Sequence, residues 1–310
     1  MDSQIPSSAP IIDFTNENLI FSTNIWLSTS NQVKNALENH GFFLVNYDKI
    51  SSEVISAIYL ALQEFHDLPT EKKSQFTSDK PYLGYCCETP QLEITGIGDT
   101  TSKEIVEGFA NLIWSSEKKY YACEIIHSYS KQVAELQEMI LRMVFESYGL
   151  EKYYKSHKES AVYTCRVNKY KAVQKNESNV GIAPHTDLSF MTIIHQNHIN
   201  GLEFKSKDGI WIPVDFPPNS FAVVAGDALT AWSNGKIQSA IHRVIMSAEV
   251  PRYSIGIFSY KNGIVQAPNE LVDEQHPLLF KPFDHFDLVS LIYTQGSHGN
   301  EDKLKFLRAI

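Results

Sequence analysis

The sequence is poor in positive charge and in long hydrophobic stretches, and both shortages narrow the possible functions. Asp and Glu number 36 against 27 Lys and Arg, which gives a formal net charge of −9. Nucleic acids and anionic membranes bind basic patches, so this balance disfavours both as partners. No stretch of about 18 apolar residues is present, and the first residues lack the basic and apolar segments of a secretory signal. We therefore expect a small-molecule partner and a cytoplasmic location.

Cysteine is also scarce. The four cysteines, Cys86, Cys87, Cys123 and Cys165, have a spacing that matches neither a zinc site nor a disulfide framework. We expect them to be reduced thiols, as in a cytoplasmic protein. The adjacent Cys86 and Cys87 are either a redox-active pair or two buried or half-buried thiols in a loop, and the usual behaviour of free cysteine favours the second interpretation.

The sequence does contain a change of periodicity near residue 160. Before it, apolar residues recur at helical spacing in the ranges 24–39, 51–65 and 117–148, and short apolar runs at 10–14 and 42–45 are typical of strands. Residues 81–99 contain several Gly and Pro and predict a loop with short extended pieces. After it, turn residues separate short strand-like runs at 161–170, 181–187, 190–195, 201–204, 210–214, 221–225, 230–233, 240–247 and 253–260, before a helix at 286–293.

This pattern of elements predicts an α+β protein with a mainly β core. Eight or so short strands with such turns suggest a double-sheet jelly roll or a barrel. We expect an N-terminal helical cap region over residues 1–155, and a jelly-roll core with a C-terminal helix over residues 156–310. No repeat or low-complexity segment marks a linker, so both regions are expected to form one compact unit, and the protein is expected to be a monomer.

A histidine two residues before a carboxylate occurs three times, beginning at His157, His185 and His285. Only the pair His185 and Asp187 is followed, 55 residues after the carboxylate, by a further histidine in a strand-like run, His242. Two histidines and one carboxylate form a facial triad, which leaves three adjacent positions open on an octahedral metal and suits non-haem Fe(II) oxygenases. The alternatives are a structural zinc site or three ordinary polar residues. Structural zinc prefers four ligands, often cysteine, and no cysteine lies within fifteen residues of the three.

Arg252-Tyr-Ser254 begins ten residues after His242. The alternation of a strand puts the guanidinium of Arg252 and the hydroxyl of Ser254 on one side, where they can bind a carboxylate through charge-assisted hydrogen bonds. The alternative is a surface salt bridge beside an ordinary strand hydroxyl. The apolar residues of this strand favour the first interpretation, and the implied ligand is an acid that also reaches the metal.

The spacing of these five residues resembles that of the plant 2-oxoglutarate/Fe(II)-dependent dioxygenases of specialised metabolism. The likeness covers nearly the whole chain, and the resemblance independently implies a double-stranded β-helix. Further runs are similar to the N-terminal region of this family, or to its AOP-like branch, named for glucosinolate side-chain enzymes: residues 10–14, 36–45, 65–73, 107–114, 166–171 and 271–285.

The resemblance also implies the ligands of the site. It implies Fe(II) as the metal and 2-oxoglutarate and O2 as co-substrates, and we expect ascorbate to stimulate turnover. The iron is expected on His185, Asp187 and His242, with no catalytic residue beyond the metal centre. The distal carboxylate of 2-oxoglutarate is expected on four residues, Arg252, Ser254, Tyr170 and Asn168. For Asn168 and Tyr170 the alternative is ordinary packing within a strand.

The expected reaction is oxidation of a mainly hydrophobic plant specialised metabolite, with release of succinate and CO2. Hydroxylation is the first expectation, and desaturation, dealkylation or ring closure are the other outcomes, because the geometry at the metal decides among them. Two alternatives stay open. One is a non-catalytic jelly-roll protein that binds a ligand, against which the complete ligand set counts. The other is an oxidase of the same scaffold that does not use 2-oxoglutarate.

A substrate pocket is expected to use aromatic side chains, although each of them is also a good core residue. The candidates are Tyr82, Tyr85, Phe109, Trp114, Phe190, Phe258 and Tyr260. Strand residues that face the metal are committed to iron and 2-oxoglutarate. We therefore expect substrate choice to reside in residues 82–114 and 283–293.

Overall fold

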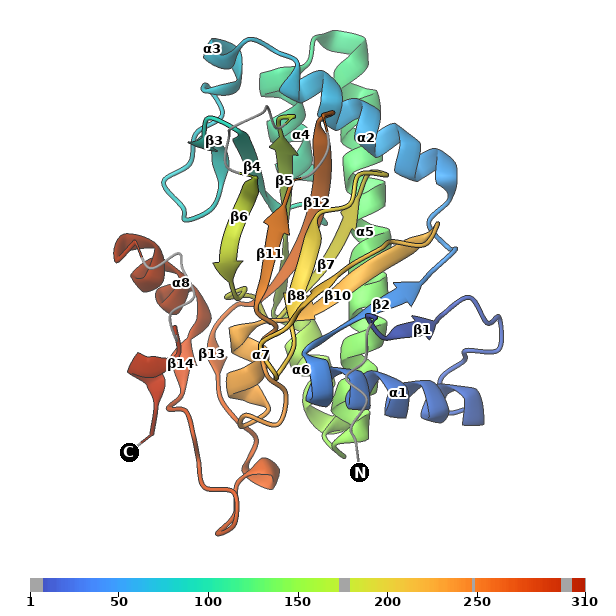
Figure 1. Cartoon of the computed structure of the whole chain (residues 1–310), viewed down its shortest axis with the longest axis vertical. Helices are drawn as coiled ribbons and strands as arrows, with labels where there is room; N and C mark the ends of the chain where they lie inside the picture. Colours follow the sequence, from blue (N-terminus) through green and yellow to red (C-terminus); the bar gives the residue numbers. More distant parts are fainter. Residues whose placement is uncertain (1–7, 173–178, 247–248, 297–302, 310) are drawn as a thin grey trace.

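Two β-sheets of unequal size form the centre of the protein in the computed structural model, which describes residues 8–172, 179–246, 249–296 and 303–309 (Figure 1). Within these ranges the larger sheet contains β1 (Ile11–Asp13), β2 (Phe42–Asn46), β10 (Ser220–Ala225), β7 (Met191–Gln196), β12 (Arg252–Lys261), β5 (Ala161–Tyr170), β4 (Leu92–Asp99) and β3 (Gly84–Thr89), in that order. The smaller sheet contains β6 (Val180–His185), β11 (His242–Ile245), β8 (Leu202–Lys205) and β9 (Trp211–Pro213), and a short third sheet pairs β13 (Ile264–Val265) with β14 (Phe283–Asp284). The predicted α+β jelly roll with a mainly β core is confirmed.

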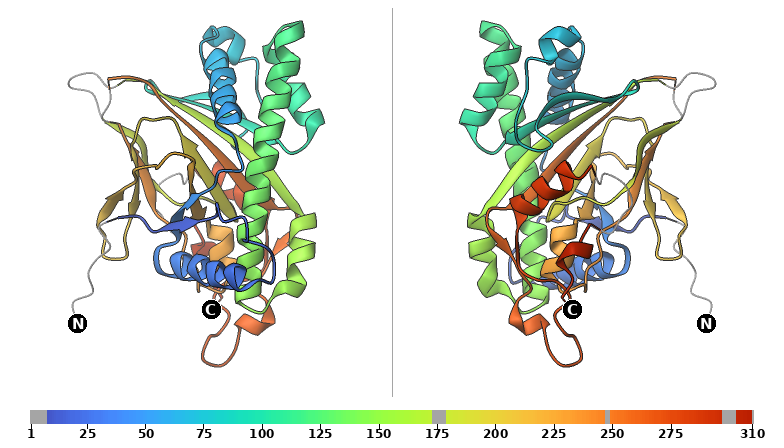
Figure 2. Two further views of the ribbon diagram at one scale, coloured as in Figure 1. Left: turned by 90° about the vertical axis from the view of Figure 1, so that its right-hand side faces the viewer. Right: turned by 90° about the vertical axis from the view of Figure 1, so that its left-hand side faces the viewer.

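The helices lie mainly on the outer face of the larger sheet, which the side views show (Figure 2). They are α1 (Asn24–His40), α2 (Ser52–His66), α3 (Thr70–Lys73), α4 (Lys103–Ile113), α5 (Ser116–Ser147), α6 (Glu151–Glu159), α7 (Asp227–Trp232) and α8 (His285–Thr294), with short 3₁₀ turns at Asn269–Leu271 and Lys305–Leu307. None of the helices in the described ranges combines the length and hydropathy that a membrane span needs.

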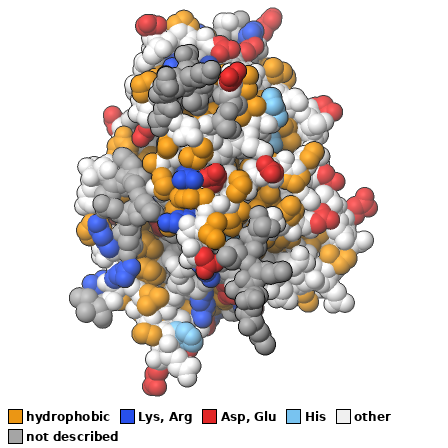
Figure 3. All heavy atoms as spheres, in the orientation of Figure 1, with side chains coloured by type: hydrophobic (Ala, Val, Ile, Leu, Met, Phe, Trp, Pro, Cys, Tyr) orange, Lys and Arg blue, Asp and Glu red, His pale blue; other side chains and the backbone are white. Residues whose placement is uncertain are grey.

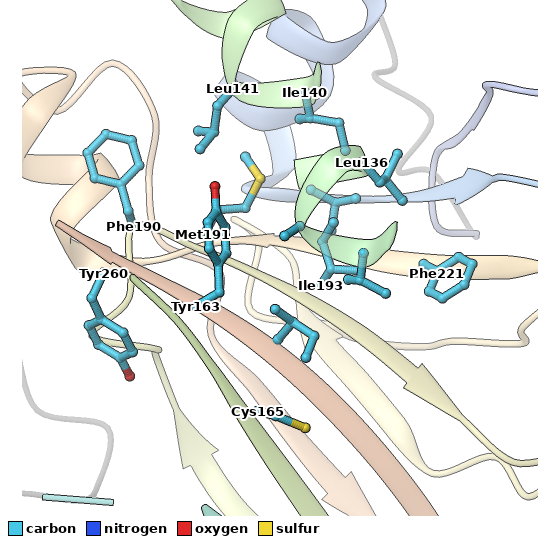
Figure 4. Close-up of a cluster of buried hydrophobic side chains, with 14 of the residues drawn as sticks. Leu136, Ile140, Leu141, Tyr163, Cys165, Phe190, Met191, Ile193, Phe221 and Tyr260 are labelled. Carbon is cyan, nitrogen blue, oxygen red and sulfur yellow. The ribbon is translucent and has the colours of Figure 1, made fainter. Parts of the chain in front are cut away.

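The main core lies between α5 and the larger sheet. Leu136, Ile140 and Leu141 of α5 point toward Met191 and Ile193 of β7, and all five side chains are buried (Figure 4). Apolar side chains at helical spacing on α5 and at alternate positions on β7 form the two matching faces. This layer fixes the larger sheet from outside, so the opposite face of the sheet is left to line the interior of the barrel.

The boundaries of α1 follow from its capping residues. The hydroxyl of Thr23 accepts a hydrogen bond from the backbone N–H of Trp26 at 3.2 Å, as expected of an N-cap. Gly41 ends the helix with a φ of 74°. A Cβ atom at this position would lie 2.3 Å from the carbonyl oxygen of Gln238, so both conformation and space require glycine. The chain then turns directly into β2, as the sequence predicted.

The chain before residue 156 adds strands to both edges of the larger sheet, β1 and β2 at one edge and β3 and β4 at the other. On β4, Glu93 accepts hydrogen bonds from Lys73 at 2.6 Å and from the hydroxyl of Tyr85 at 2.9 Å, and its carboxylate lies 3.5 Å from Nδ1 of His66. These four residues are called the Glu93 cluster below. They tie β4 to the end of α2 and to α3. The division of the chain near residue 155 stays a prediction.

Residues 81–99 are not a loop with short extended pieces, as expected, because their extended parts, β3 and β4, make up most of the segment and pair as an antiparallel hairpin. The glycines that suggested a loop have a packing role instead. A Cβ atom at Gly96 would lie 1.9 Å from the carbonyl oxygen of Tyr82, so glycine is needed for the chain to pass over the strand. Cys86 and Cys87 lie on β3 and are exposed, which corrects the expectation of buried or half-buried thiols in a loop.

The predicted strand at 230–233 is also wrong, because α7 occupies residues 227–232. This run is short and entirely buried, so its apolar side chains show neither the helical nor the strand period. Asn234 and Gly235 both have positive φ, at 50° and 78°, but they end this helical turn and do not connect two strands of a hairpin. Helix α4 was not predicted.

Candidate metal centre and its cavity

The structure brings His185, Asp187 and His242 together at one end of the smaller sheet. His185 ends β6, His242 begins β11, and the two are direct partners across these antiparallel strands. Oδ1 of Asp187 lies 3.7 Å from Nε2 of His185 and 3.9 Å from Nε2 of His242. In the described ranges this is the one group of three or more His, Cys, Asp or Glu whose ligand atoms lie within 4.8 Å of one another. The donor set, two imidazoles and a carboxylate, suits Fe(II).

The ring orientation of both histidines is fixed by the protein. Nδ1 of His185 donates to the carbonyl oxygen of Ala183 at 2.9 Å, and Nδ1 of His242 donates to the carbonyl oxygen of Ala240 at 3.1 Å. A carbonyl oxygen can only accept, so the proton of each neutral ring resides on Nδ1. The Nε2 lone pairs are therefore free to bind a metal.

Asp187 is held from its other side. The hydroxyl of Thr192 donates to Oδ2 of Asp187 at 2.7 Å, which leaves Oδ1 directed toward the histidines. The backbone N–H of Asp227, the first residue of α7, donates to the carbonyl oxygen of Asp187 at 2.7 Å. The hydroxyl of Thr186 donates to Oδ2 of Asp227 at 3.0 Å. Helix α7 thus positions the turn that presents the carboxylate.

The protonation states of the triad agree with metal binding. Burial, together with the neighbouring His242, lowers the pKa of His185 to about 3. Burial by itself raises the pKa of Asp187, but the two histidines outweigh burial and lower that pKa below its ordinary value. At neutral pH the triad therefore presents a neutral His185 imidazole and an ionised carboxylate, the forms that bind a divalent metal.

Arg252 lies deep inside the barrel, with only 1% of its surface exposed. One terminal nitrogen donates to Oε1 of Gln196 at 2.7 Å, but Nε and the other terminal nitrogen are buried with no hydrogen-bond partner among the described residues. A buried guanidinium with unpaired donors is destabilising unless a ligand supplies acceptors. Two free donors in one plane match the two oxygens of a carboxylate.

Ser254 and Asn168 complete this end of the barrel. They are direct partners on β12 and β5, and the amide nitrogen of Asn168 donates to the hydroxyl of Ser254 at 3.3 Å. The amide oxygen of Asn168 is buried without a partner in the described ranges. Tyr170 pairs with Arg252 two register positions away, and its ring centre lies 4.7 Å from Cζ of Arg252. All four residues predicted to bind 2-oxoglutarate are thus neighbours.

A cavity of about 1020 Å³ opens beside the metal triad and has His185 and Asp187 in its wall. Its walls come from both sheets, from the β3–β4 hairpin and from Tyr293 of α8. Four of the predicted pocket residues line it, Tyr82, Tyr85, Phe258 and Tyr260. In Figure 4 the ring of Tyr260 points away from α5, on the barrel side of its strand. Hydrophobic side chains cover much of the middle of the face shown in Figure 3, and Lys and Arg gather at its lower left.

The prediction is wrong for the other three aromatic candidates, because Phe109, Trp114 and Phe190 lie outside the cavity wall. Phe109 and Trp114 are buried among the helices that back the larger sheet, with ring centres 5.6 Å apart. Phe190 is fully buried, and its ring centre is 4.3 Å from the ring of His157. Each of these positions follows the ordinary burial of large aromatic side chains, and the cavity takes its aromatics from the barrel face and the hairpin.

Two residues of the site were missed from the sequence. Thr192 and Gln196, four residues apart on one face of β7, hold Asp187 and Arg252, respectively. The only signal was the presence of two polar side chains on the same face of a largely apolar strand. The other two histidine motifs have structural roles. Nε2 of His285 donates to the carbonyl oxygen of Leu188 at 2.8 Å, and His157 is buried in the helical layer.

Comparison with known families agrees with this site. Residues 161–260 match the model of the 2OG-Fe(II) oxygenase superfamily. Residues 9–109 match the model described as non-haem dioxygenase in morphine synthesis N-terminal. The first range contains the triad and the residues around Arg252.

Individual relatives cover nearly the whole chain. The Arabidopsis thaliana protein named probable 2-oxoglutarate-dependent dioxygenase AOP1 is 37% identical over 309 residues, 96% of each chain. 2-oxoglutarate-dependent dioxygenase AOP3 from the same plant is 30% identical and covers 93% of this chain and 94% of its own.

Solved structures agree with these relatives. The rice dioxygenase for auxin oxidation has a TM-score of 0.83 and 27% identity, over 97% of this chain and 100% of that one. The Arabidopsis thaliana dioxygenase for auxin oxidation 1 in its 2-oxoglutarate complex has a TM-score of 0.78 and 28% identity, over 87% and 99%. With the triad and the jelly roll in place, the chain belongs to the 2-oxoglutarate/Fe(II)-dependent dioxygenases, which are oxidoreductases that act on small molecules with O2 as co-substrate.

Proposed function

We propose that this dioxygenase binds Fe(II) through His185, Asp187 and His242 and oxidises a mainly hydrophobic plant metabolite in the cavity beside them. The convergence of three ligand atoms within 4.8 Å, two of whose residues, His185 and Asp187, lie in the wall of a 1020 Å³ cavity, is the observation that supports the proposal most strongly. The iron centre with 2-oxoglutarate and O2 supplies the oxidising power when bound. The protein contributes position and surroundings.

Arg252, Ser254, Asn168 and Tyr170 form the proposed site for the distal carboxylate of 2-oxoglutarate. The two buried donors of Arg252 that lack a partner in the described ranges are the feature that fits this anion. Gln196 occupies the remaining donor and so fixes the plane of the guanidinium. Held in this way, the co-substrate is oriented along the barrel toward the triad, and orientation of reactants accounts for a large part of enzymatic rate enhancement.

The substrate is proposed to lie against Tyr82, Tyr85, Phe258 and Tyr260. These rings give the cavity an apolar lining that suits a hydrophobic body with few polar groups. Hydroxylation of a C–H bond held near the triad is the proposed outcome. A non-catalytic ligand-binding role is disfavoured, because such a protein has no need of a complete metal triad together with unpaired buried donors on Arg252.

The test is an anaerobic titration of the purified protein with Fe(II) and then with 2-oxoglutarate, followed by the metal-to-ligand charge-transfer absorbance. We expect the band to form in the wild-type protein and to be absent from Asp187→Ala. A screen of plant metabolites, scored by succinate release, then identifies substrates. A wild-type protein that binds iron but never develops the band would overturn the 2-oxoglutarate site.

We also propose that the protein is a cytoplasmic monomer. The free state of all four cysteines supports a reducing compartment, since thiols persist there. Cell fractionation and the mass measured by light scattering test the two parts of this proposal separately.

A further inference from the structure

A second arginine, Arg166, lies on the barrel face of β5 and lines the cavity. Arg166, Asn168 and Tyr170 occupy alternate positions of β5, so their side chains lie on the same face of the strand. Of the three, Arg166 is the one that lines the cavity. Both of its cross-strand partners are glycines, Gly96 on β4 and Gly256 on β12. The space beside these glycines is filled by other residues of the cavity wall: a Cβ atom at Gly256 would lie 2.7 Å from the ring of Phe258, and one at Gly96 would lie 1.9 Å from the carbonyl oxygen of Tyr82.

The guanidinium of Arg166 has no hydrogen-bond or ion-pair partner within the described part of the chain. Its Nε is buried without a hydrogen-bond partner, and no carboxylate in the described part of the chain lies within ion-pair distance of its guanidinium. The ring of Tyr82 is its nearest aromatic neighbour, with 5.6 Å between Cζ and the ring centre. Tyr82 has a φ of 61°, a left-handed conformation uncommon for an aromatic residue. The chain therefore holds this ring against the arginine at some conformational cost.

The other charged groups of the cavity are committed elsewhere. His185 and Asp187 belong to the metal triad. Lys303 donates its ammonium to the carbonyl oxygen of Thr186. Glu88 lies on β3 and is exposed to solvent. Arg166 is thus the cavity cation whose charge has no protein acceptor among the described residues.

We propose that Arg166 binds a carboxylate on the primary substrate, so that the substrate class is hydrophobic carboxylic acids. This inference rests on the proposed function, and it adds the polar group by which the substrate is oriented. A planar guanidinium matches the two oxygens of a carboxylate, and its partly desolvated position strengthens the pair. The aromatic lining contacts the apolar remainder of the molecule.

Arg166 and Arg252 are separate anion sites in this interpretation. Arg252 is almost fully buried and is fixed by Gln196 and Tyr170, whereas Arg166 is half-buried and faces the cavity. The first suits a co-substrate that is the same in every turnover. The second suits a molecule that enters through the cavity mouth. The net charge of −9 also matters, because an acid that approaches an acidic protein needs a local cation to bind.

The test compares acids with their methyl esters, because esterification removes the charge and leaves the hydrophobic body. Phenylacetate, 3-phenylpropanoate and octanoate, each with its ester, are titrated calorimetrically into the anaerobic protein loaded with Fe(II) and 2-oxoglutarate. We expect at least one acid to bind about tenfold more tightly than its ester, as for a hydrogen-bonded charge pair. If no acid binds more tightly than its ester, the proposal is wrong.

Two variants and a matched control locate the effect. Arg166→Gln is expected to reduce the affinity of the acid to that of the ester, and Arg166→Lys to retain part of the preference. Lys169→Gln removes one charge from the same strand on the opposite face, where Lys169 pairs with Asp67 at 3.2 Å, and is expected to behave as the wild type. Equal loss in Lys169→Gln would reduce the effect to general charge and overturn the proposal.

The 2-oxoglutarate affinity of the same variants separates this inference from the proposed function. We expect Arg166→Gln to keep the wild-type affinity for 2-oxoglutarate. A loss there would assign Arg166 to the co-substrate and overturn the inference while leaving the dioxygenase function intact. If the charge-transfer band does not form in the wild type, the proposed function itself is wrong, whatever the Arg166 variants show. Should both variants fail to fold, the acid-to-ester ratio of the wild type still decides.

Discussion

At the inner end of the barrel the functional side chains are buried and each is held by a neighbour, whereas along the outer wall of the cavity they are more exposed and less restrained. Thr192 holds Asp187 and Gln196 holds Arg252. On β3, by contrast, every residue after Tyr85 is exposed. The difference indicates that the reacting groups are fixed by strands of the jelly roll and that the hairpin is free to differ between relatives. Positioning on rigid strands and selectivity on a surface element are a common division of roles.

The largest effect is expected from the triad. His185→Ala, Asp187→Ala or His242→Ala should each abolish iron-dependent turnover, because two remaining ligands do not hold the metal in place. The fold should persist, since the triad contributes little to so large a core. Succinate release measures turnover, and the thermal midpoint measures the fold. Normal turnover in one of these variants would remove that residue from the metal site.

A smaller effect is expected from Arg252→Lys, which keeps the charge but loses the planar pair of donors. The Kd for 2-oxoglutarate should rise about tenfold to a hundredfold, since hydrogen bonds to charged groups contribute about 1.5–3 kcal/mol each. Arg243→Lys is the matched control, because Arg243 pairs with Glu203 at 2.7 Å away from the cavity wall. Equal affinity in Arg252→Lys and the control would argue strongly against the proposed carboxylate site.

Thr192→Val tests the support beneath the metal ligands. The variant preserves shape but removes the hydroxyl that donates to Asp187. Iron affinity should fall about tenfold, as for other residues that orient metal ligands. The measurement is an anaerobic Fe(II) titration with and without 2-oxoglutarate. Unchanged iron affinity would mean that the hydrogen bond from Thr192 does not contribute to metal binding by Asp187.

His285 links α8 to the inner end of the barrel, and its effect is on stability. Burial lowers its pKa to about 4 in the folded protein, below the ordinary 6.5. The unfolded chain therefore takes up the proton first as the pH falls, so the contribution to stability is complete above pH 6.5 and is lost toward pH 4. Between pH 7 and pH 5 the loss should be about 2 kcal/mol. His285→Gln should show a correspondingly smaller decrease in unfolding free energy over that interval, measured by urea titration at each pH.

The smallest effect on the metal and 2-oxoglutarate sites is expected when residues 82–91 are exchanged for those of a relative. The KM for 2-oxoglutarate should change less than about twofold, while the set of oxidised compounds should change, because selectivity is assigned to the wall. Glu93 lies outside the exchanged segment, so the Glu93 cluster keeps its acceptor. A folded chimaera with its original substrate profile would move selectivity away from β3.

The part of the fold that rests on periodicity could be predicted from the sequence. Helix α5 and the paired strands β5 and β12 have long, regular patterns, and the triad follows from residue type and spacing. The hairpin could not be predicted, because Gly84 and Gly96 look like loop residues until the chain that crosses Gly96 is known. Short buried segments such as α7 have no period to detect.

The supporting residues of the site could not be found in this way, because their roles depend on neighbours across the sheet. Gln196 is one more polar residue until β12 places Arg252 beside it. The position of Arg166 likewise could not be predicted, because its neighbours on the adjacent strands, Gly96 and Gly256, are far away in sequence. Spacing along one chain identifies metal ligands, whereas contacts between strands identify the groups that position them.

The Glu93 cluster has a consequence for how the cavity can open. Hydrogen bonds from His66, Lys73 and Tyr85 outweigh burial and lower the pKa of Glu93 well below its ordinary value, so this carboxylate stays charged and paired. Removing one partner of such a buried pair costs about 3–5 kcal/mol, so the cluster anchors β4 to the helices. Because Tyr85 of β3 also belongs to the cluster, the beginning of β3 is held as well, and the part of the hairpin that lies beyond these contacts is the exposed end of β3, residues 86–89.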